Sequence, residues 1–192
     1  MMGYNVGICK VKWTRPASSY INGKQVQRKE YAIWRAMMQR QKHNYPHKGY
    51  EGVLVEGDFN NYDLFYDWLI TQKGYGEIDD KGNLFQLDKD LLGNGLTYSK
   101  TCCILLPREI NNATIRPHKK KELPTGVYKS KGGFICRMSK YNVEEVLGFY
   151  TTVEEASQAY KQTKKSYLCE LAEKWKDKID NRAYTALINY TI

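Results

Sequence analysis

The stretch that decides the fold is GVYKSKGGFICRMSKYNVEEVLGFYTTVEEASQAY, which spans residues 126–160. The glycine pair at 132–133 separates two short runs rich in β-branched and aromatic residues, a pattern typical of a hairpin. A third such run follows, and from Val153 the hydrophobic spacing becomes helical. The pattern predicts a helix from Val153 to about Lys174, preceded by three short antiparallel strands at Gly126–Lys129, Phe134–Lys140 and Val146–Phe149.

The second of these strands has two distinct faces. Side chains alternate along a strand, so Phe134, Cys136 and Met138 are expected on one face. These apolar residues would pack against the helix. The opposite face would then point outward. Its expected members from the first two strands are Tyr128, Ser130, Ile135, Arg137 and Ser139.

Four short motifs in this segment carry a resemblance to a known family: Gly-Val at 126–127, aromatic-x-x-Arg at 134–137, Leu-Gly-x-aromatic at 147–150 and Thr-x-Glu-Glu-Ala at 152–156. Through them the segment resembles the plant Apetala-two (ethylene-response-factor) DNA-binding domain and its versions in bacteriophage endonucleases. In that family the outward sheet face lies in the DNA major groove. The resemblance therefore implies double-stranded DNA as partner. Besides the outward set, Lys129, Lys131 and Lys140 would reach phosphates from the rim.

Charge is distributed unevenly along the 192 residues, whose formal net charge is +9. Residues 1–48 carry a net +9, residues 49–115 a net −6 and residues 116–192 a net +6. An acidic centre between basic segments suits a cation site beside a nucleic acid, although a solvated acidic surface gives the same pattern. The five cysteines lack zinc-site spacing, so they are expected to be reduced thiols.

Upstream of the basic run 116–122, the pattern predicts strands and short helices. Helices are expected at Tyr31–Gln41 and Tyr62–Thr71. A strand over Leu84–Leu92, a turn at 93–95 and a strand over Cys102–Leu106 follow. Pro107 suits the first turn of a short helix over Arg108–Ala113. The order strand, strand, short helix is that of a ββα unit.

This half also resembles the bacteriophage endonucleases, which carry an HNH-like, ββα-metal nuclease region before the sheet module. The matching pieces are Trp34-Arg-Ala-Met37, Leu87-Asp-Lys-Asp90, Tyr98-Ser-Lys-Thr-Cys102 and Pro107-Arg-Glu-Ile-Asn111. The resemblance implies a metal-dependent DNA endonuclease acting in the cytoplasm of a host bacterium.

The chemistry of such a site can be assigned to particular residues. Asp88 and Asp90 are two apart on the expected strand, so their carboxylates would share one face. Asn111 lies on the short helix that follows. A carboxylate facing an Asn side chain can hold one Mg²⁺ with open positions for phosphate and water. We expect Asp88 and Asn111 as metal ligands, Asp90 as ligand or base, and Glu109 as a weaker ligand candidate.

The group that activates water is left open by the sequence. The HNH pattern places a histidine at the strand, but none occurs between His47 and His118. Lys89 could act as base only if burial made it neutral. Other readings are that Asp88 or Asp90 is the base, that His43 or His47 folds over the site, or that catalysis has been lost.

The sequence thus predicts an α+β chain: an HNH-like ββα region at 1–115 with a basic N-terminal arm, a basic linker at 116–123, the sheet module at 124–175 and a C-terminal helical extension at 176–192. No segment is apolar enough to suggest a membrane partner. The favoured function is a Mg²⁺-dependent DNA endonuclease. The rival functions are a non-catalytic DNA-binding regulator or inhibitor of a host enzyme, and a module that binds protein.

Overall fold

The computed structural model describes residues 13–42, 46, 50–115, 122–141 and 143–192. The chain is α+β, as predicted, and combines helices with several small sheets. It divides into two compact units, the first formed by residues 1–77 and 87–105 and the second by 78–86 and 106–192. The expected linker at 116–123 falls within the sequence of the second unit, and its residues 116–121 lie outside the described part.

The first unit is built on two helices. Helix α1 (Lys29–Arg40) buries one face that is rich in aromatic and methionine side chains, as its spacing predicted. Helix α2 (Tyr62–Leu69) is capped by the Asn61 side chain, which accepts the backbone N–H of Asp63 at 2.8 Å. Between them, the 3₁₀ helix η2 (Gly57–Asn60) brings the Phe59 carbonyl to 2.8 Å from the Trp34 indole N–H. The resulting core contains Tyr31, Trp34, Met37, Met38, Phe59, Tyr62, Phe65 and Leu69.

Short strands complete the first unit. Strands β1 (Ser18–Ile21) and β2 (Lys24–Gln27) form an antiparallel hairpin. Strand β3 (Leu54–Val55) pairs in parallel with β5 (Thr97–Tyr98), an element that the sequence pattern did not indicate. Both strands are only two residues long, which is too short for an alternation of apolar and polar residues to be recognised in the sequence.

The strand predicted over Leu84–Leu92 is much shorter in the structure. Strand β4 spans Gln86–Asp88 and pairs with β6 (Ile104–Leu106) in a two-stranded sheet. The chain turns after Asp88 because its side chain accepts the backbone N–H groups of Asp90 and Leu91. The prediction that Asp88 and Asp90 share one face of a continuous strand is therefore wrong.

In the second unit, the strands β7 (Val127–Ser130), β8 (Gly133–Lys140) and β9 (Val143–Tyr150) form an antiparallel sheet in the order β7-β8-β9. The register shifts after Cys136, which faces Gly148, while Arg137 faces Val146. One residue of β9, Leu147, is thus extra, as in a β-bulge. The shift changes which side chains of β9 share a face.

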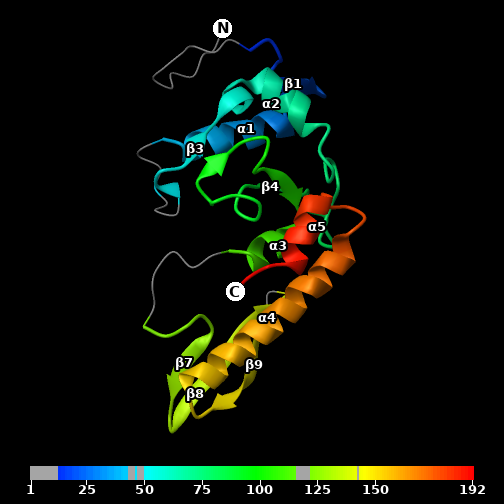
Figure 1. Cartoon of the computed structure of the whole chain (residues 1–192). Helices are drawn as coiled ribbons and strands as arrows, with labels where there is room; N and C mark the ends of the chain where they lie inside the picture. Colours follow the sequence, from blue (N-terminus) through cyan, green and yellow to red (C-terminus); the bar gives the residue numbers. More distant parts are fainter. Residues whose placement is uncertain (1–12, 43–45, 47–49, 116–121, 142) are drawn as a thin grey trace. The chain divides into compact units, whose positions relative to one another are not determined.

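Helix α4 (Val153–Trp175) runs along one side of this sheet (Figure 1). It starts with a capping box in which Thr152 and Glu155 exchange hydrogen bonds of 3.2 Å. Beneath the sheet, Val127, Cys136 and Ala156 are buried together. Gly126 has a φ of +79°, and a Cβ there would lie 2.2 Å from the Tyr160 ring, so this position requires glycine.

Two short helices belong to the same unit. Helix α3 spans Arg108–Ala113, as predicted, and α5 (Asn181–Ile188) packs against α4. Lys165 of α4 donates to the carbonyl of Tyr190 at 3.2 Å and to that of Ile188, which caps the end of α5. Within the described ranges, no helix combines the length and apolar character that crossing a bilayer requires.

Candidate catalytic residues and nucleic-acid interface

Asp88 is a buried carboxylate at the end of β4. Its side chain is 3% exposed, and Oδ1 accepts the N–H of Leu91 at 2.9 Å and that of Asp90 at 3.2 Å. Burial raises the pKa of Asp88 to about 6, and the charge of Asp90 adds to the effect, although both hydrogen bonds act in the opposite direction. Asp88 is therefore partly protonated near neutral pH, which is unusual for an aspartate.

Lys89 is buried beside it and acts as a hydrogen-bond donor. Its Nζ lies 2.7 Å from Asp90 Oδ1 and 2.6 Å from the carbonyl oxygen of Gly95, closing the loop between those residues. The rings of Tyr50 and Tyr98 lie 5.6 and 5.5 Å from the same nitrogen. A general base must accept a proton, so these contacts favour a structural role for Lys89 over the predicted role as base.

Asp90 differs from Asp88 in its exposure. Its side chain is 45% exposed, and it is held by the ion pair with Lys89. Of the two carboxylates that the sequence placed together, one is buried and one faces solvent. The histidines His43, His47 and His118, which were considered for water activation, lie outside the described residues.

Asn111 and Glu109 occupy α3 in the second unit. Asn111 donates from Nδ2 to the Gln86 side chain at 3.1 Å. Glu109 Oε1 accepts Lys174 Nζ at 2.6 Å and the Trp175 indole N–H, so this carboxylate is already engaged. Asp88 belongs to the first unit and Asn111 to the second, and their joint binding of a metal stays a prediction.

Within residues that the structure describes, no group of three or more His, Cys, Asp or Glu side chains could hold an ion. The Mg²⁺ ion therefore stays an expectation from the resemblance.

The outward face of the sheet combines aromatic and polar side chains. Tyr128 faces Ile135, and Ile135 faces Phe149, so three strands contribute to one row. Tyr128 is 44% exposed and Phe149 is 72% exposed, but Ile135 between them is only 8% exposed. Of the predicted contact residues in this row, Tyr128 is thus accessible, whereas Ile135 is covered by its neighbours.

Arg137 lies on the same face, two residues after Ile135 on β8, and contacts two neighbouring side chains. Its guanidinium lies 5.8 Å from the Tyr128 ring centroid, and its Nη1 lies 3.4 Å from Glu144 Oε2. Ser130 and Ser139 are exposed. An acidic partner reduces the net positive charge that Arg137 offers to a phosphate or a base.

The three predicted phosphate contacts differ in their partners. Lys129 lies 3.1 Å from Glu122, and Lys140 lies 3.6 Å from Glu170. Lys131, in the turn between β7 and β8, has no ion pair with any described residue. Of these three lysines, Lys131 is therefore the one whose ammonium group is most available to a phosphate.

Phe149 is the accessible residue that strand alternation did not identify. Val146 and Phe149 are three apart, so strict alternation would place them on opposite faces. Since the extra residue Leu147 shifts the register, both lie outward, at 53% and 72% exposure. Gly148 next to Leu147 was the available signal, because a glycine inside a strand often marks a bulge.

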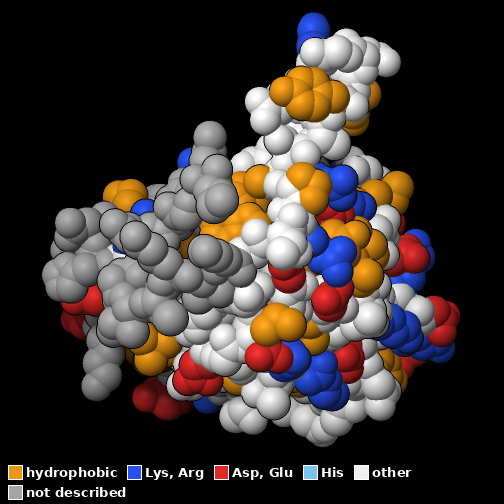
Figure 2. Space-filling model, turned by 90° about the horizontal axis from the view of Figure 1, so that it is seen from above, with side chains coloured by type: hydrophobic (Ala, Val, Ile, Leu, Met, Phe, Trp, Pro, Cys, Tyr) orange, Lys and Arg blue, Asp and Glu red, His pale blue; other side chains and the backbone are white. Residues whose placement is uncertain are grey.

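Charges on the surface seen in Figure 2 are mixed. Lys and Arg side chains alternate with Asp and Glu over the described part of that face, and hydrophobic side chains lie between them. This face therefore presents no extended area of a single sign.

A comparison with models of protein families, with curated proteins and with solved structures gives no match for the chain.

Proposed function

We propose that this chain is a DNA endonuclease that hydrolyses phosphodiester bonds with a divalent cation, Mg²⁺, and holds duplex DNA on the sheet β7-β8-β9. The observation that carries the proposal is the buried Asp88, whose pKa is raised to about 6. Carboxyl groups with strongly perturbed pKa values concentrate at functional sites. The motif Leu87-Asp-Lys-Asp90 that contains Asp88 is also one of the pieces that resemble bacteriophage endonucleases.

The open sheet face supports the DNA-binding part. A three-stranded sheet has the width to enter a major groove about 12 Å wide. Its accessible side chains include Arg137, which can donate two hydrogen bonds to a guanine, and Phe149, which can contact a thymine methyl group. Lys131, which has no ion pair with a described residue, supplies an ammonium group at the edge for a phosphate.

The hydrogen bonding of Asp88 fits a cation ligand. Oδ1 receives both backbone N–H groups, whereas Oδ2 receives no hydrogen bond from a described residue. A buried carboxylate with one uncompensated oxygen is stabilised in its ionised form by a cation. Asp88 would bind Mg²⁺ through Oδ2.

When bound, Mg²⁺ would polarise a phosphoryl oxygen and stabilise the leaving oxygen. Asp90 is the exposed carboxylate of the same loop, so it is the proposed acceptor of the proton from the attacking water. Lys89 would keep the loop in place through its bonds to Asp90 and Gly95.

A non-catalytic DNA-binding protein is the second candidate. The favouring observation is that Lys89 and one oxygen of Asp88 are used in local turn contacts, which a purely structural role would also explain. In this case the sheet would bind DNA, and the upstream motif would be a degenerate nuclease scaffold.

One experiment separates the two candidates. Purified full-length protein is incubated with supercoiled plasmid in Mg²⁺ or in EDTA, and the same samples are run in a gel shift. Nicking that requires Mg²⁺ supports the endonuclease. A gel shift without nicking in either condition would support the non-catalytic protein, and neither nicking nor a shift at low salt would contradict both.

A further inference from the structure

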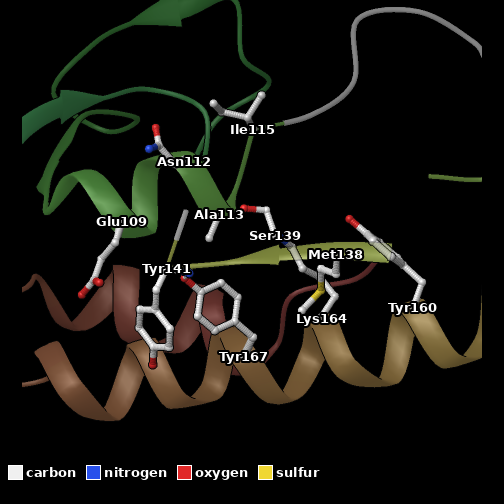
Figure 3. Close-up of a pocket in the computed structure, with 10 residues that line it drawn as sticks. All are labelled: Glu109, Asn112, Ala113, Ile115, Met138, Ser139, Tyr141, Tyr160, Lys164 and Tyr167. Atoms are coloured by element: carbon white, nitrogen blue, oxygen red, sulfur yellow. The ribbon is translucent and has the colours of Figure 1, made fainter. Parts of the chain in front are cut away.

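A hollow of about 220 Å³ lies within the second unit, between α3, the end of β8 and α4 (Figure 3). Apolar side chains, among them Met138 and Ala113, form part of its wall. The remainder is polar and comes from Asn112, Ser139, Tyr141, Tyr160, Lys164 and Tyr167, with Glu109 at one side.

Lys164 gives this hollow a positive charge. It is half-buried, and burial lowers its pKa below the ordinary value. Its Nζ lies 5.9 Å from the centroid of the Tyr167 ring, and it forms no ion pair with a described residue. An ammonium group that is partly desolvated without a carboxylate destabilises the folded chain, and a bound anion would offset that cost.

Glu109 does not supply the missing counter-charge. Its Oε1 is bound by Lys174 at 2.6 Å and by the indole N–H of Trp175. Lys174 is bound in turn by Asp80 at 2.5 Å. Lys174 is shared by two carboxylates, so Asp80, Lys174 and Glu109 together sum to −1, but Glu109 is engaged by Lys174 and Trp175 and forms no ion pair with Lys164.

Hydrogen-bond donors surround the same space. Tyr160 and Lys164 are one helical turn apart on α4, so they lie on one face of the helix. The Tyr160 hydroxyl forms no hydrogen bond with a described residue. Tyr167 accepts the Tyr141 N–H at 3.0 Å and keeps its own O–H proton for a ligand.

We propose that this hollow binds one phosphate group of a phosphate ester, with Lys164 Nζ as the counter-charge and the Tyr160 and Tyr167 hydroxyls as donors. Its volume is several times the about 30 Å³ of a water molecule in the liquid and below the about 300–1,000 Å³ of pockets for drug-sized ligands, so it suits a small group of this kind. The phosphate can come from a free monoester or from a DNA strand. Only the second source rests on the function proposed above.

The test is a calorimetric titration of the full chain with inorganic phosphate and with glycerol phosphate at constant ionic strength. Lys164→Gln removes the charge and Tyr160→Phe removes one hydroxyl, while Lys161→Gln removes an exposed charge from the same helix as a matched control. We expect saturable binding by the wild type and by Lys161→Gln. Binding should be at least 10-fold weaker in Lys164→Gln and a few-fold weaker in Tyr160→Phe, in line with a charge-assisted and a neutral hydrogen bond.

A parallel titration with duplex DNA identifies the source of the phosphate. If Lys164→Gln weakens duplex binding and lowers the salt slope by about 1, while Lys161→Gln does not, the site takes a phosphate of the DNA strand. The proposal is overturned if Lys164→Gln matches the wild type with every ligand, or if Lys161→Gln loses as much affinity. Circular dichroism and thermal unfolding of each variant show whether it is folded, and Tyr160→Phe keeps the ring that packs on Gly126.

Discussion

Two aspartate turns, one in each unit, use the same local chemistry with opposite results. Asp88 accepts the backbone N–H groups of Asp90 and Leu91, and Asp79 accepts those of Lys81 and Asn83. Yet the pKa of Asp88 is raised to about 6 by burial, whereas the hydrogen bonds to Asp79 hold its pKa below the ordinary value. The local sequence therefore determines that each aspartate forms a turn, whereas the surrounding residues determine the pKa of its carboxyl group.

The surroundings of the two carboxylates explain the difference. Asp79 also receives two contacts of 3.1 Å from the Asn83 side-chain amide, which supports the ionised form with extra donors. Asp88 receives no side-chain hydrogen bond from a residue that the structure describes, and it lies deeper, at 3% exposure. A protein that keeps a carboxylate in this condition has either a structural use for its protonated form or a cation that binds its ionised form.

The largest effect on stability is expected from Asp88→Asn. The amide oxygen can still accept both backbone N–H groups, and the cost of ionising a buried carboxylate disappears. Because the folded pKa of about 6 lies above the unfolded value of 3.8, wild-type stability is full below pH 4 and falls as the pH rises through 6. The difference of about 2 pKa units corresponds to about 3 kcal/mol.

Denaturant unfolding over pH 4 to 8, without divalent cations, measures this effect. Asp88→Asn should be more stable than the wild type by up to about 3 kcal/mol at pH 7, and the two proteins should converge near pH 4. A variant that is less stable than the wild type at pH 7 would show that the ionised carboxylate is already compensated in the folded chain.

A smaller effect is expected on the sheet face. Phe149→Ala removes an aromatic side chain that is 72% exposed, so the fold should be nearly unchanged. If the face binds DNA, duplex affinity measured by fluorescence anisotropy should fall by about 10-fold, in the range of one good base contact. Leu64→Ala, on an exposed position of α2, is the matched control. Equal affinity of both variants and the wild type would remove Phe149 from the interface.

The smallest effect is expected from Asp79→Asn, which completes the comparison of the two turns. The pKa of Asp79 is lowered in the folded state, so its contribution is present above pH 4 and is lost as the pH falls. The variant should lose a little stability at pH 7, opposite in sign to Asp88→Asn, and the difference should shrink when the pH is lowered to 2. Thermal unfolding at both pH values checks this, and a gain at pH 7 would refute the account of the Asp79 turn.

Much of the second unit could be predicted from the sequence, because its signals are local. Pro107 set the start of α3, the glycine pair at 132–133 set a strand turn, and the helical spacing from Val153 set the start of α4. The bulge at Leu147 was not predicted, since it depends on pairing between strands. It decides that Phe149 is exposed on the outward face.

The candidate catalytic loop was predicted less well. Its residues were identified, but the sequence placed Asp88 and Asp90 on one strand face, and the structure ends β4 at Asp88. The competing factor is the aspartate side chain itself, which binds backbone N–H groups two and three residues ahead. The hydrophobic periodicity of the sequence could not predict the burial of Lys89 either, because that burial follows from tertiary contacts with Tyr50, Tyr98 and Gly95.

The central claim is that Asp88 serves DNA hydrolysis, and its most direct test is the single-turnover cleavage rate of supercoiled plasmid at saturating protein with Mg²⁺. Asp88→Asn is compared with Glu56→Gln, which removes an exposed carboxylate from the same unit. The account predicts that Asp88→Asn lowers the cleavage rate by about 100-fold or more while DNA binding is retained, since one electrostatic contact to a transition state is typically worth about 10²–10³. Wild-type cleavage by Asp88→Asn, or an equal loss in Glu56→Gln, would contradict it.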